Sequence, residues 1–588
     1  MASNLKVSGF SRRGALAVAI SLLCAGCADG LRRFPLADPL TVDPDTQPFT
    51  PRPADYFSGF YGDGGDQILL RPIARFFAVD PAGESVNVNA LDEVPDSSWY
   101  QNRKGAVDLD ADAVGSGACE TPPLDPTVAW TVTGAKPNGA NPGFIIRGND
   151  GNRYLLKFDS VNQPQRATAA DVIGSRLYWA AGFNAPCNRV VYFDAATLTI
   201  GEGSTAEDEQ GHEIPLTRAL IDQALDRAGA QPDGRYRAAA SLFLPGRPIG
   251  PFRYEDTRKD DPNDVVEHDD RRELRGAKLM AAWLNHFDAR EQNTLDVWIE
   301  TGGEDGAGYV RHYYLDFGDT LGSLWDIAGM SQRLGSSHYF DFNWLARDFF
   351  TFGTQKRPWE LRRLPPERGG VFGYFDAEHF DAERWKPGYP NPAFLRMSER
   401  DGAWMARKMA RFTRADLEAA VREGRLTEPT WETWVVDTLE ARLRKVLERY
   451  LTRVSPLDRP VLQQDAEGAT LCFEDPLVLS GMRLHTLRTY AALAYDLDAR
   501  AAARPWPAVH ALADPEHDSP PGVCVQLPST PQNTPTKPGY FVLDLTATTQ
   551  DAGSSPAFPT RAHLVRLDDG TWRLVGLERP LDTRPPRP

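Results

Sequence analysis

Long apolar runs are scarce in this chain of 588 residues, although 41% of its residues are hydrophobic. Beyond the first thirty residues no run is apolar enough to cross a bilayer, which takes about 20 residues. Basic residues are also too few to balance the acidic ones: 65 Lys and Arg face 81 Asp and Glu, which leaves a formal net charge of −16. Because this charge would repel phosphates, we expect no nucleic-acid partner. The chain is long enough for two or three domains with hydrophobic cores.

Cysteine is scarce as well, with six residues, and beyond the two near the N-terminus none are spaced as C-x-x-C, which argues against a zinc ribbon. Apart from two near the N-terminus, the cysteines are Cys119, Cys187, Cys472 and Cys524. In an oxidising compartment they could form two disulfides in three ways. Pairing Cys119 with Cys187 and Cys472 with Cys524 keeps each bridge within one region, but the sequence leaves the other two pairings open.

The N-terminal residues have the pattern of an export signal. Basic residues precede an apolar run from Ala15 to Leu23, which is followed by Cys24-Ala25-Gly26-Cys27. Small residues directly before a cysteine are typical of a lipoprotein signal peptide. We therefore expect residues 1–27 to be a signal peptide and Cys27 to carry lipid. The lipid would anchor the protein in a bacterial cell envelope, at the outer membrane and facing the periplasm or the surface. An uncleaved transmembrane anchor is the alternative, although the run is short for one.

Composition and periodicity divide the rest of the chain into four regions and predict an α+β fold. Residues 28–127 are expected to be a Pro- and Asp-rich tether followed by a segment that braces a larger domain, with a loop at 108–118. Residues 128–250 are rich in strand and turn signals, and residues 251–455 are mainly helical. Residues 460–588 are predicted to be a separate β-rich domain whose role the sequence does not indicate.

The strand-rich region begins with two predicted hairpins. A Gly-containing turn with Gly139 and Gly143 separates the first two strands, and an N-D-G-N turn leads into a strand that contains Lys157. A helix is predicted next, from 169 to 181, with Asp171 in its first turn. Asp171 has two readings: a partner for Lys157, or a capping-box residue that serves the helix start together with Thr168. Lys157 itself could be an ordinary lysine at a strand edge.

Acids and an amide are grouped further along the chain. His286-x-Asp288 is followed by Asn293 five residues after the aspartate, and Asp316-Phe317-Gly318 ends a strand that could pair with Leu295–Ile299. Phosphoryl transfer uses such a set, in which one acid orients the attacking hydroxyl while an amide oxygen and a second acid hold Mg²⁺. His286 is expected to brace the loop rather than to carry a proton.

The spacing H-x-D-x-x-x-x-N followed by D-F-G resembles the catalytic and metal-binding loops of protein kinases. The run H-Y-Y-L-D-F-G-D-T-L-G is most similar to the atypical branches: lipid kinases, HipA-type kinases and spore-coat CotH kinases. The resemblance covers about residues 130–451. It implies a two-lobed domain, with a β-rich small lobe at 128–250 and a helical large lobe at 251–455.

The resemblance also implies roles. Asp288 would orient the hydroxyl of a protein or small-molecule acceptor, and Asn293 and Asp316 would hold Mg²⁺. Lys157, paired with Asp171, would contact the phosphates of ATP, beneath a loop that contains Gly139 and Gly143. The chain departs from the family pattern in two places, since the Gly loop is not G-x-G-x-x-G and the helix offers Asp rather than the usual Glu.

Two other functions remain open from the sequence. The same fold could bind a nucleotide or a partner without catalysis, or the acids could be turn residues of an unrelated scaffold lipoprotein. The kinase-like arrangement predicts that Lys157, Asp288, Asn293 and Asp316 come together in space. If the protein is instead an unrelated scaffold, these four residues need not lie close together.

Overall fold

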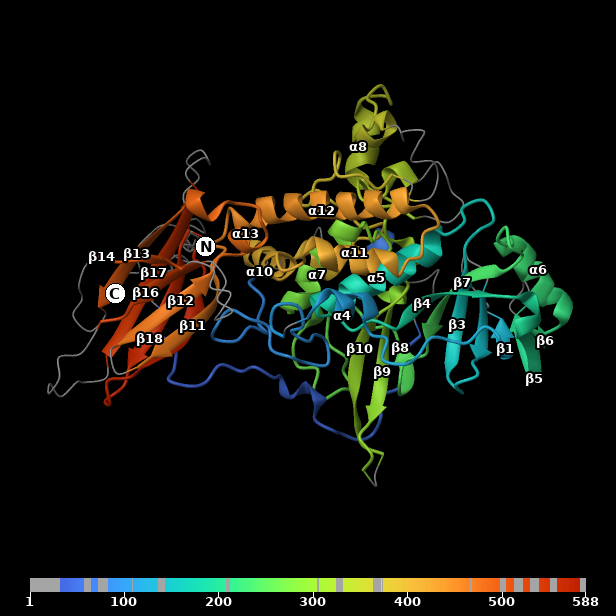
Figure 1. Ribbon diagram of the computed structural model, residues 1–588, viewed down its shortest axis with the longest axis horizontal. Coiled ribbons are helices and arrows are strands. Elements are labelled where there is room, and N and C mark those ends of the chain that lie inside the picture. Colours follow the sequence, from blue (N-terminus) through green and yellow to red (C-terminus); the bar gives the residue numbers. More distant parts are fainter. Residues whose placement is uncertain are drawn as a thin grey trace, which may run out of the picture.

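The protein is a mixed α+β molecule, as the sequence predicts, with three parts that follow one another along its long axis (Figure 1). A strand-rich part lies at one end, a helical body in the middle and a β-sandwich at the other end. The computed structural model describes residues 32–57, 65–71, 83–107, 109–135, 143–207, 212–303, 306–323, 331–362, 372, 374–465, 468–496, 504–511, 522–528, 539–549 and 558–581. Residues 1–27, including Cys27, therefore lie outside the described residues, as does Gly139.

The strand-rich part is a seven-stranded sheet with the order β4-β7-β3-β2-β1-β5-β6. Its strands are β1 (Trp130–Ala135), β2 (Gly143–Arg147), β3 (Arg153–Phe158), β4 (Asn188–Phe193), β5 (Leu198–Glu207), β6 (Glu213–Pro215) and β7 (Tyr236–Leu242). Strands β1 to β3 form the two predicted hairpins, and helix α6 (Arg218–Ala228) packs Ile221 and Leu225 against the sheet. The long strand β5 pairs with β6 at the end of this sheet.

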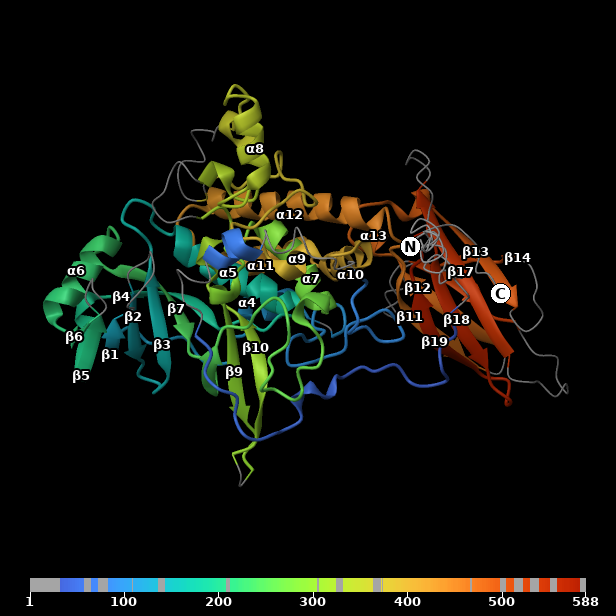
Figure 2. The same cartoon turned by 180° about the vertical axis from the view of Figure 1, so that it is seen from behind.

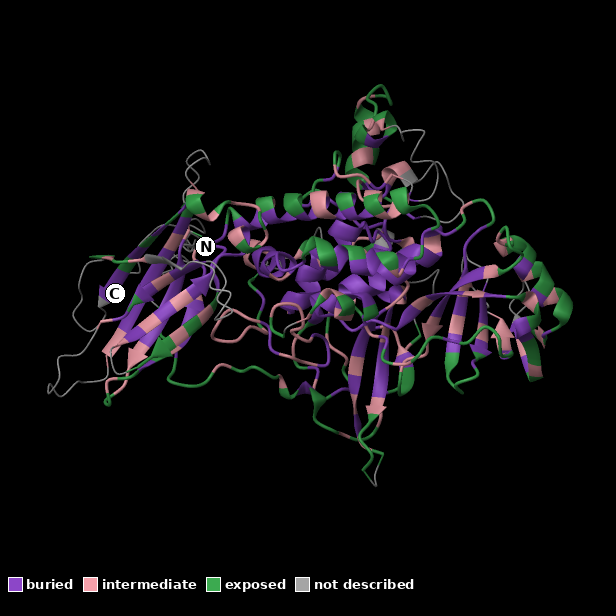
Figure 3. Cartoon of the chain, in the orientation of Figure 1, coloured by how far each residue is buried: buried purple, intermediate pink, exposed green. Residues whose placement is uncertain are grey.

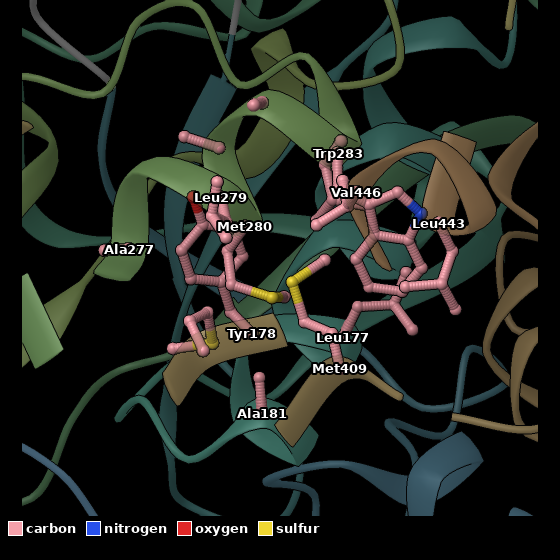
Figure 4. Close-up of a cluster of buried hydrophobic side chains, with 14 of the residues drawn as sticks. Leu177, Tyr178, Ala181, Ala277, Leu279, Met280, Trp283, Met409, Leu443 and Val446 are labelled. Carbon is pink, nitrogen blue, oxygen red and sulfur yellow. The ribbon is translucent and has the colours of Figure 1, made fainter. Parts of the chain in front are cut away.

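Helix α5 (Arg166–Ala181) connects this sheet to the helical body, because nearly all of its residues are buried. Its Leu177, Tyr178 and Ala181 join a core with side chains of α7 (Arg272–Leu284) and α12 (Pro429–Leu451) (Figure 4). The body also contains α4 (Ala111–Ser116), α9 (Pro392–Leu395), α10 (Glu399–Met409) and α11 (Arg414–Arg422). Seen from behind, these helices gather below the long α12 (Figure 2).

A three-stranded sheet with the order β10-β9-β8 adjoins the loops that contain Asp288, Asn293 and Asp316. Strands β9 (Thr294–Glu300) and β10 (Gly308–Tyr314) form the expected hairpin, in which Tyr313 lies opposite Leu295. Strand β8 (Arg247–Gly250) pairs with β9. The predicted boundary at residue 250 is therefore too late, because β8 belongs to the sheet of the second region and the chain leaves the seven-stranded sheet after β7.

The C-terminal sandwich consists of two sheets with the orders β11-β12-β16-β15 and β14-β13-β17-β18-β19. Apolar side chains of both sheets, such as Phe473 and Leu543, share one core. The strands are β11 (Asp458–Gln464), β12 (Ala469–Glu474), β13 (Arg488–Asp496), β14 (Arg504–Trp506), β15 (Val509–Ala511), β16 (Gly522–Gln526), β17 (Gly539–Thr549), β18 (Thr560–Arg566) and β19 (Trp572–Glu578).

The described residues also contain several short helices. The remaining α-helices are α8 (Phe342–Phe350) and α13 (Pro476–Leu479). The single turns are η2 (Pro44–Thr46), η3 (Asp66–Leu70), η4 (Ala195–Thr197), η5 (His268–Asp270), η6 (Glu291–Asn293), η7 (Phe317–Asp319), η8 (Ser331–Arg333), η9 (Pro358–Leu361) and η11 (His485–Leu487). Within the described ranges, no helix has the length and apolar character that a membrane crossing would need.

The described residues contain two disulfides, which join cysteines 68 and 52 residues apart along the chain. Cys119 is bonded to Cys187, which ties the segment after α4 to the start of β4. Cys472 is bonded to Cys524, directly across the β12–β16 strand pair. This is the pairing that keeps both bridges local, one of the three that the sequence allowed.

The N-terminal segment is packed along the molecule and is not the free tether that its Pro- and Asp-rich composition suggested. The backbone N–H of Phe34 donates to Tyr540 Oη in the sandwich at 3.0 Å. Phe49 contacts Trp298 of β9, with ring centroids 5.0 Å apart. Aromatic residues therefore hold this segment against the rest of the molecule, and its Pro- and Asp-rich composition does not predict these contacts. The predicted loop at 108–118 is also wrong in part, because Asp110 caps a short helix, α4, by accepting from Ala113 N–H at 2.7 Å.

Candidate functional site

Lys157 occupies a central strand of the seven-stranded sheet, where β3 is paired on both sides. Its neighbour on β2 is Gly143, and its neighbour on β7 is Ala239. Lys157 is therefore not at a sheet edge, and the reading of an ordinary edge lysine is wrong. Gly143 is the first residue of β2, so one of the two predicted loop glycines lies beside the lysine.

Asp171 lies on α5 and its side chain faces Lys157. The carboxylate Oδ2 is 3.5 Å from Lys157 Nζ, and Oδ1 accepts from the backbone N–H of Phe317 at 2.9 Å. The capping reading of Asp171 is wrong, because α5 begins at Arg166, three residues before the predicted start. The helix start is served instead by Asp159, which accepts from the N–H and the hydroxyl of Thr168 at 2.9 and 2.6 Å.

Asp316 completes an ion-pair triad with these two residues. Its Oδ1 is 2.8 Å from Lys157 Nζ, so these two residues lie together, as the kinase-like arrangement predicts. Burial alone would lower the pKa of Lys157, but the charges of Asp171 and Asp316 outweigh it and raise that pKa. The lysine is therefore fully charged at neutral pH. The side chain of Asp316 keeps 44% of its surface exposed, whereas that of Asp171 is buried.

The backbone at Asp316 is held in a left-handed conformation, with φ 54° and ψ 63°. Aspartate tolerates this region better than most residues, and such strain is common at functional sites. Two contacts fix the segment after it. Phe317 donates its N–H to Asp171, and the side chain of Phe317 packs against Gly174 on α5. The D-F-G segment is thus fastened to the helix that carries Asp171.

Gly174 is the point of closest approach between α5 and this segment. A Cβ at Gly174 would lie 2.7 Å from Phe317 Cβ, a distance that requires one of the two elements to shift. We expect Gly174→Ala to lower the free energy of unfolding by about 1–3 kcal/mol, as overpacking does. The measurement is a denaturant titration. Gly115→Ala on α4 is the control, because its Cβ would meet Ala419 at an ordinary 3.4 Å. An unchanged midpoint for Gly174→Ala would contradict the expected overpacking.

Asp288 and Asn293 form the second half of the site, on the loop that follows α7. The side-chain amide of Asn293 donates to the Asp288 carboxylate and to the Asp288 carbonyl, both at 2.8 Å. The carbonyl of Asn293 accepts from Leu315 N–H at 2.9 Å, so this loop is fixed to the residue just before Asp316. Arg290 Nε lies 3.1 Å from Asp288 Oδ1. Lys157, Asp288, Asn293 and Asp316 are thus brought together.

Asp288 and Asp319 both have a raised pKa, chiefly because they are buried and in part because neighbouring acids repel them. Burial raises the pKa of Asp288 to about 6; Arg290 and the Asn293 amide oppose the shift, and Asp316 adds to it. Asp319, which the sequence reading missed, lies three residues after Asp316. Burial, then the charges of Asp288 and Asp316, raise its pKa well above the usual range. A place where several carboxylates repel one another is one where a cation would be stabilised.

His286 supports the loop as a neutral ring. It is buried, its Nδ1 is 3.1 Å from Tyr178 Oη, and its ring lies beside Phe317 with centroids 5.6 Å apart. Burial lowers its pKa to about 4, so it is uncharged at neutral pH. This agrees with the bracing role expected for it.

Two tyrosines near Asp288 were not found from the sequence. The charge of Asp288 adds to the effect of burial in raising the pKa of both Tyr339 and Tyr389. Their rings are 5.1 Å apart, and Arg290 lies over the ring of Tyr389. They come from the stretch between Gly322 and Phe394, where sequence periodicity gave no clear elements, so only the folded chain shows their position.

The residues present fit a cation and its phosphate ligands, without forming a complete metal site by themselves. No group of three or more His, Cys, Asp or Glu side chains within the described part of the chain is arranged to hold a metal ion. Mg²⁺ in nucleotide sites usually takes one or two protein oxygens, with phosphates and water supplying the others. Asp316, with its partly exposed carboxylate, and Asn293 could supply such oxygens. One buried oxygen of Asp171, Oδ2, also has no hydrogen-bond partner.

Comparison with known proteins adds little to this geometry. No protein-family model matches the chain, and no curated protein matches it. Among solved structures, the Golgi casein kinase and the same kinase with Mn and ADP bound each match with 9% sequence identity. Each match covers 58% of this chain and 76% of the other, with a TM-score of 0.29. A score this low carries no weight for fold or function, so we base the following proposal on the site itself.

Proposed function

We propose that this protein is a kinase-like transferase that binds a Mg²⁺–nucleotide and transfers its phosphoryl group, or another nucleotide-derived group, to an acceptor hydroxyl. The observation that carries the proposal is the position of Lys157. Its ammonium lies between Asp316 at 2.8 Å and Asp171 at 3.5 Å, on a strand whose neighbour pairs Gly143 with the lysine. A lysine, a helix acid and a metal-binding acid are the parts that phosphoryl transfer requires together.

Each residue would have a separate task. Asp171 would hold the side chain of Lys157, which would contact the nucleotide phosphates. Asp316 and Asn293 would bind Mg²⁺, whose chemistry when bound is to neutralise charge on the phosphate oxygens. Asp288 would face the acceptor, because its carboxylate is oriented by Asn293 and Arg290 on the side where Tyr339 and Tyr389 lie.

Asp288 would act on the acceptor by proton transfer. Above pH 6 its carboxylate is ionised and can accept the proton of an acceptor hydroxyl as that oxygen bonds to the terminal phosphorus and the bond from this phosphorus to the departing nucleoside diphosphate breaks. Its pKa near 6 is close to the working pH, as is favourable for a general base. The positive charge of Arg290 would favour the ionised form of Asp288 at that pH, and Arg290 would also orient the carboxylate.

Nucleotide binding without transfer is the second candidate, and one observation favours it. Lys157 pairs directly with Asp316, the proposed metal-binding acid, so its charge already compensates the carboxylate that Mg²⁺ would need. In addition, the short Asp171 reaches Lys157 Nζ only at 3.5 Å, longer than an ordinary charged hydrogen bond. A stable pair of this kind would suit a protein that binds a ligand and does not turn it over.

The experiment that tests the proposal combines binding with transfer. The purified protein is melted with ATP, ADP or GTP, each with and without Mg²⁺ or Mn²⁺, and incubated with γ-labelled nucleotide and an envelope extract. A metal-dependent rise in melting temperature together with label on the protein or on an extract component supports the transferase. A rise with no labelled product supports the binding protein, and no rise with any nucleotide would contradict both.

We also propose that the protein is lipid-anchored in a bacterial envelope through Cys27, as the signal-like N-terminus suggests. The two disulfides are consistent with an oxidising compartment. We expect Cys27→Ser to move a large share of the protein from the membrane fraction to the soluble fraction. Cys24→Ser is the matched control and should leave it in the membrane. If Cys27→Ser stays membrane-bound and is not processed, the N-terminal run is instead an uncleaved anchor.

A further inference from the structure

Helix α8 projects from the helical body without burying any of its own residues. Figure 1 shows it standing clear of the neighbouring helices, and Figure 3 shows it coloured mainly as exposed. None of the nine residues of α8 is buried, although more than half are aromatic or aliphatic. Helix α6 is the useful contrast, because this other surface helix buries Ile221 and Leu225 against the sheet.

The apolar residues of α8 lie on the side that the body does not cover. Phe342, Leu345 and Phe349 have the i, i+3, i+7 spacing of one helix face, which globular proteins normally turn towards their core. Here all three are exposed. The helix is held through another side chain, Trp344, whose ring packs edge-on against the buried Trp359 at 4.9 Å. The fold therefore fixes the helix and presents its apolar stripe outwards.

The turn after α8 extends this surface. Phe349 and Phe350 each expose 77% of their area, and Phe352 exposes 93%. Three neighbouring phenylalanines this exposed form a patch that soluble proteins avoid unless it contacts something. The patch is convex, because it lies on a projecting helix and its turn.

The charge of the projection is opposite to that of the whole protein. Residues 342–358 contain three basic side chains, Arg347, Lys356 and Arg357, and one acid, Asp348. This local net charge of +2 is the sum of 3 and −1, in a chain whose net charge is −16. Exposed phenylalanines next to basic residues are typical of segments that lie in the interface of an anionic membrane.

We propose that α8 and its following turn, residues 342–358, insert their apolar side chains into the surface of an anionic lipid bilayer. A bilayer fits a convex aromatic patch because it is fluid and needs no matching pocket. Anionic headgroups would complement the basic residues of the projection. The contact would hold the helical body against the membrane and would add to any anchor at the N-terminus.

The test uses vesicle flotation with the chain from residue 28, which keeps every described helix, strand and disulfide and lacks the signal-like segment. Vesicles contain either phosphatidylethanolamine and phosphatidylglycerol at 3:1 or phosphatidylcholine alone. We expect binding to the anionic vesicles, reduced at least about tenfold in the variant Phe349→Ser/Phe350→Ser/Phe352→Ser. Lys356→Glu should weaken binding to anionic vesicles and leave any binding to phosphatidylcholine unchanged.

A matched control removes exposed apolar side chains elsewhere. Val265→Ser/Leu484→Ser changes two residues that are 79% and 67% exposed, and it should float like the wild type. Circular dichroism and melting establish that each variant is folded. Equal flotation of the triple Phe variant and the wild type would overturn the proposal, and so would no flotation of the wild type. Wild-type self-association that the triple variant loses, without lipid binding, would assign the patch to a second copy of this chain and would also overturn it.

Discussion

We expect Asp316→Asn to abolish the stabilisation of the protein by Mg²⁺ and nucleotide. Asp316 provides the partly exposed charged oxygen of the proposed metal site, and asparagine keeps its size while removing that charge. A ligand at about 100 times its dissociation constant stabilises a protein by roughly 2.7 kcal/mol, which corresponds to a rise of several degrees in melting temperature. We expect this rise in the wild type and its loss in Asp316→Asn. The measurement is a thermal melt with and without ATP and Mg²⁺.

The control for this prediction is Asp569→Asn, which changes an exposed turn aspartate in the sandwich that accepts from Thr571. It should keep the whole ligand-dependent rise. Melting without ligand shows whether Asp316→Asn itself remains folded, since Lys157 retains Asp171 as a partner. If Asp316→Asn keeps the Mg²⁺-dependent rise, Asp316 does not bind the metal.

Asp288→Asn separates binding from transfer. The variant lacks the carboxylate that would accept the acceptor proton, but the proposed phosphate and metal contacts of Lys157 and Asp316 are untouched. Loss of a general base lowers a rate by about 100-fold or more. We expect label transfer to fall by this factor while the nucleotide-dependent rise in melting temperature is kept. Asp381→Asn, an exposed turn aspartate, should leave both unchanged.

The same residue gives the reaction its pH dependence. The pKa of Asp288 is raised to about 6, so the active carboxylate form is lost as the pH falls through 6. Transfer by the wild type should therefore decrease about tenfold per pH unit well below 6, provided that the protein remains folded. The residual activity of Asp288→Asn should show no such decrease at low pH. A wild-type rate that is flat between pH 5 and 7 would contradict the role of Asp288 as the base.

The parts of the site that the sequence predicted are those that lie close together along the chain. The loop with Asp288 and Asn293 and the D-F-G segment are joined by the β9–β10 hairpin, so strand periodicity alone brings them near each other. Helix α7 (Arg272–Leu284) can likewise be recognised in the sequence, because its apolar residues repeat with the helical period.

The parts that the sequence could not predict depend on distant contacts. The start of α5 was not predicted correctly, because the residue that caps it, Asp159, lies at the end of β3, nine residues before its partner Thr168. A rule that considers only the residues next to a helix start does not find such a cap. Asp319 has no distinguishing neighbours in the sequence, and only burial beside Asp288 and Asp316 raises its pKa. The exposure of the α8 stripe could not be predicted either, because apolar residues at helical spacing normally face a core.

The most direct test of the central claim is a crystal structure of the protein with Mg²⁺ and a slowly hydrolysed ATP analogue. We predict a metal ion about 2.0–2.2 Å from oxygens of both Asp316 and Asn293. We also predict Lys157 Nζ within hydrogen-bonding distance of a phosphate oxygen, and Asp288 on the far side of the transferable phosphate from the nucleoside. Nucleotide and metal bound elsewhere, or no bound nucleotide at saturating concentration, would contradict the account.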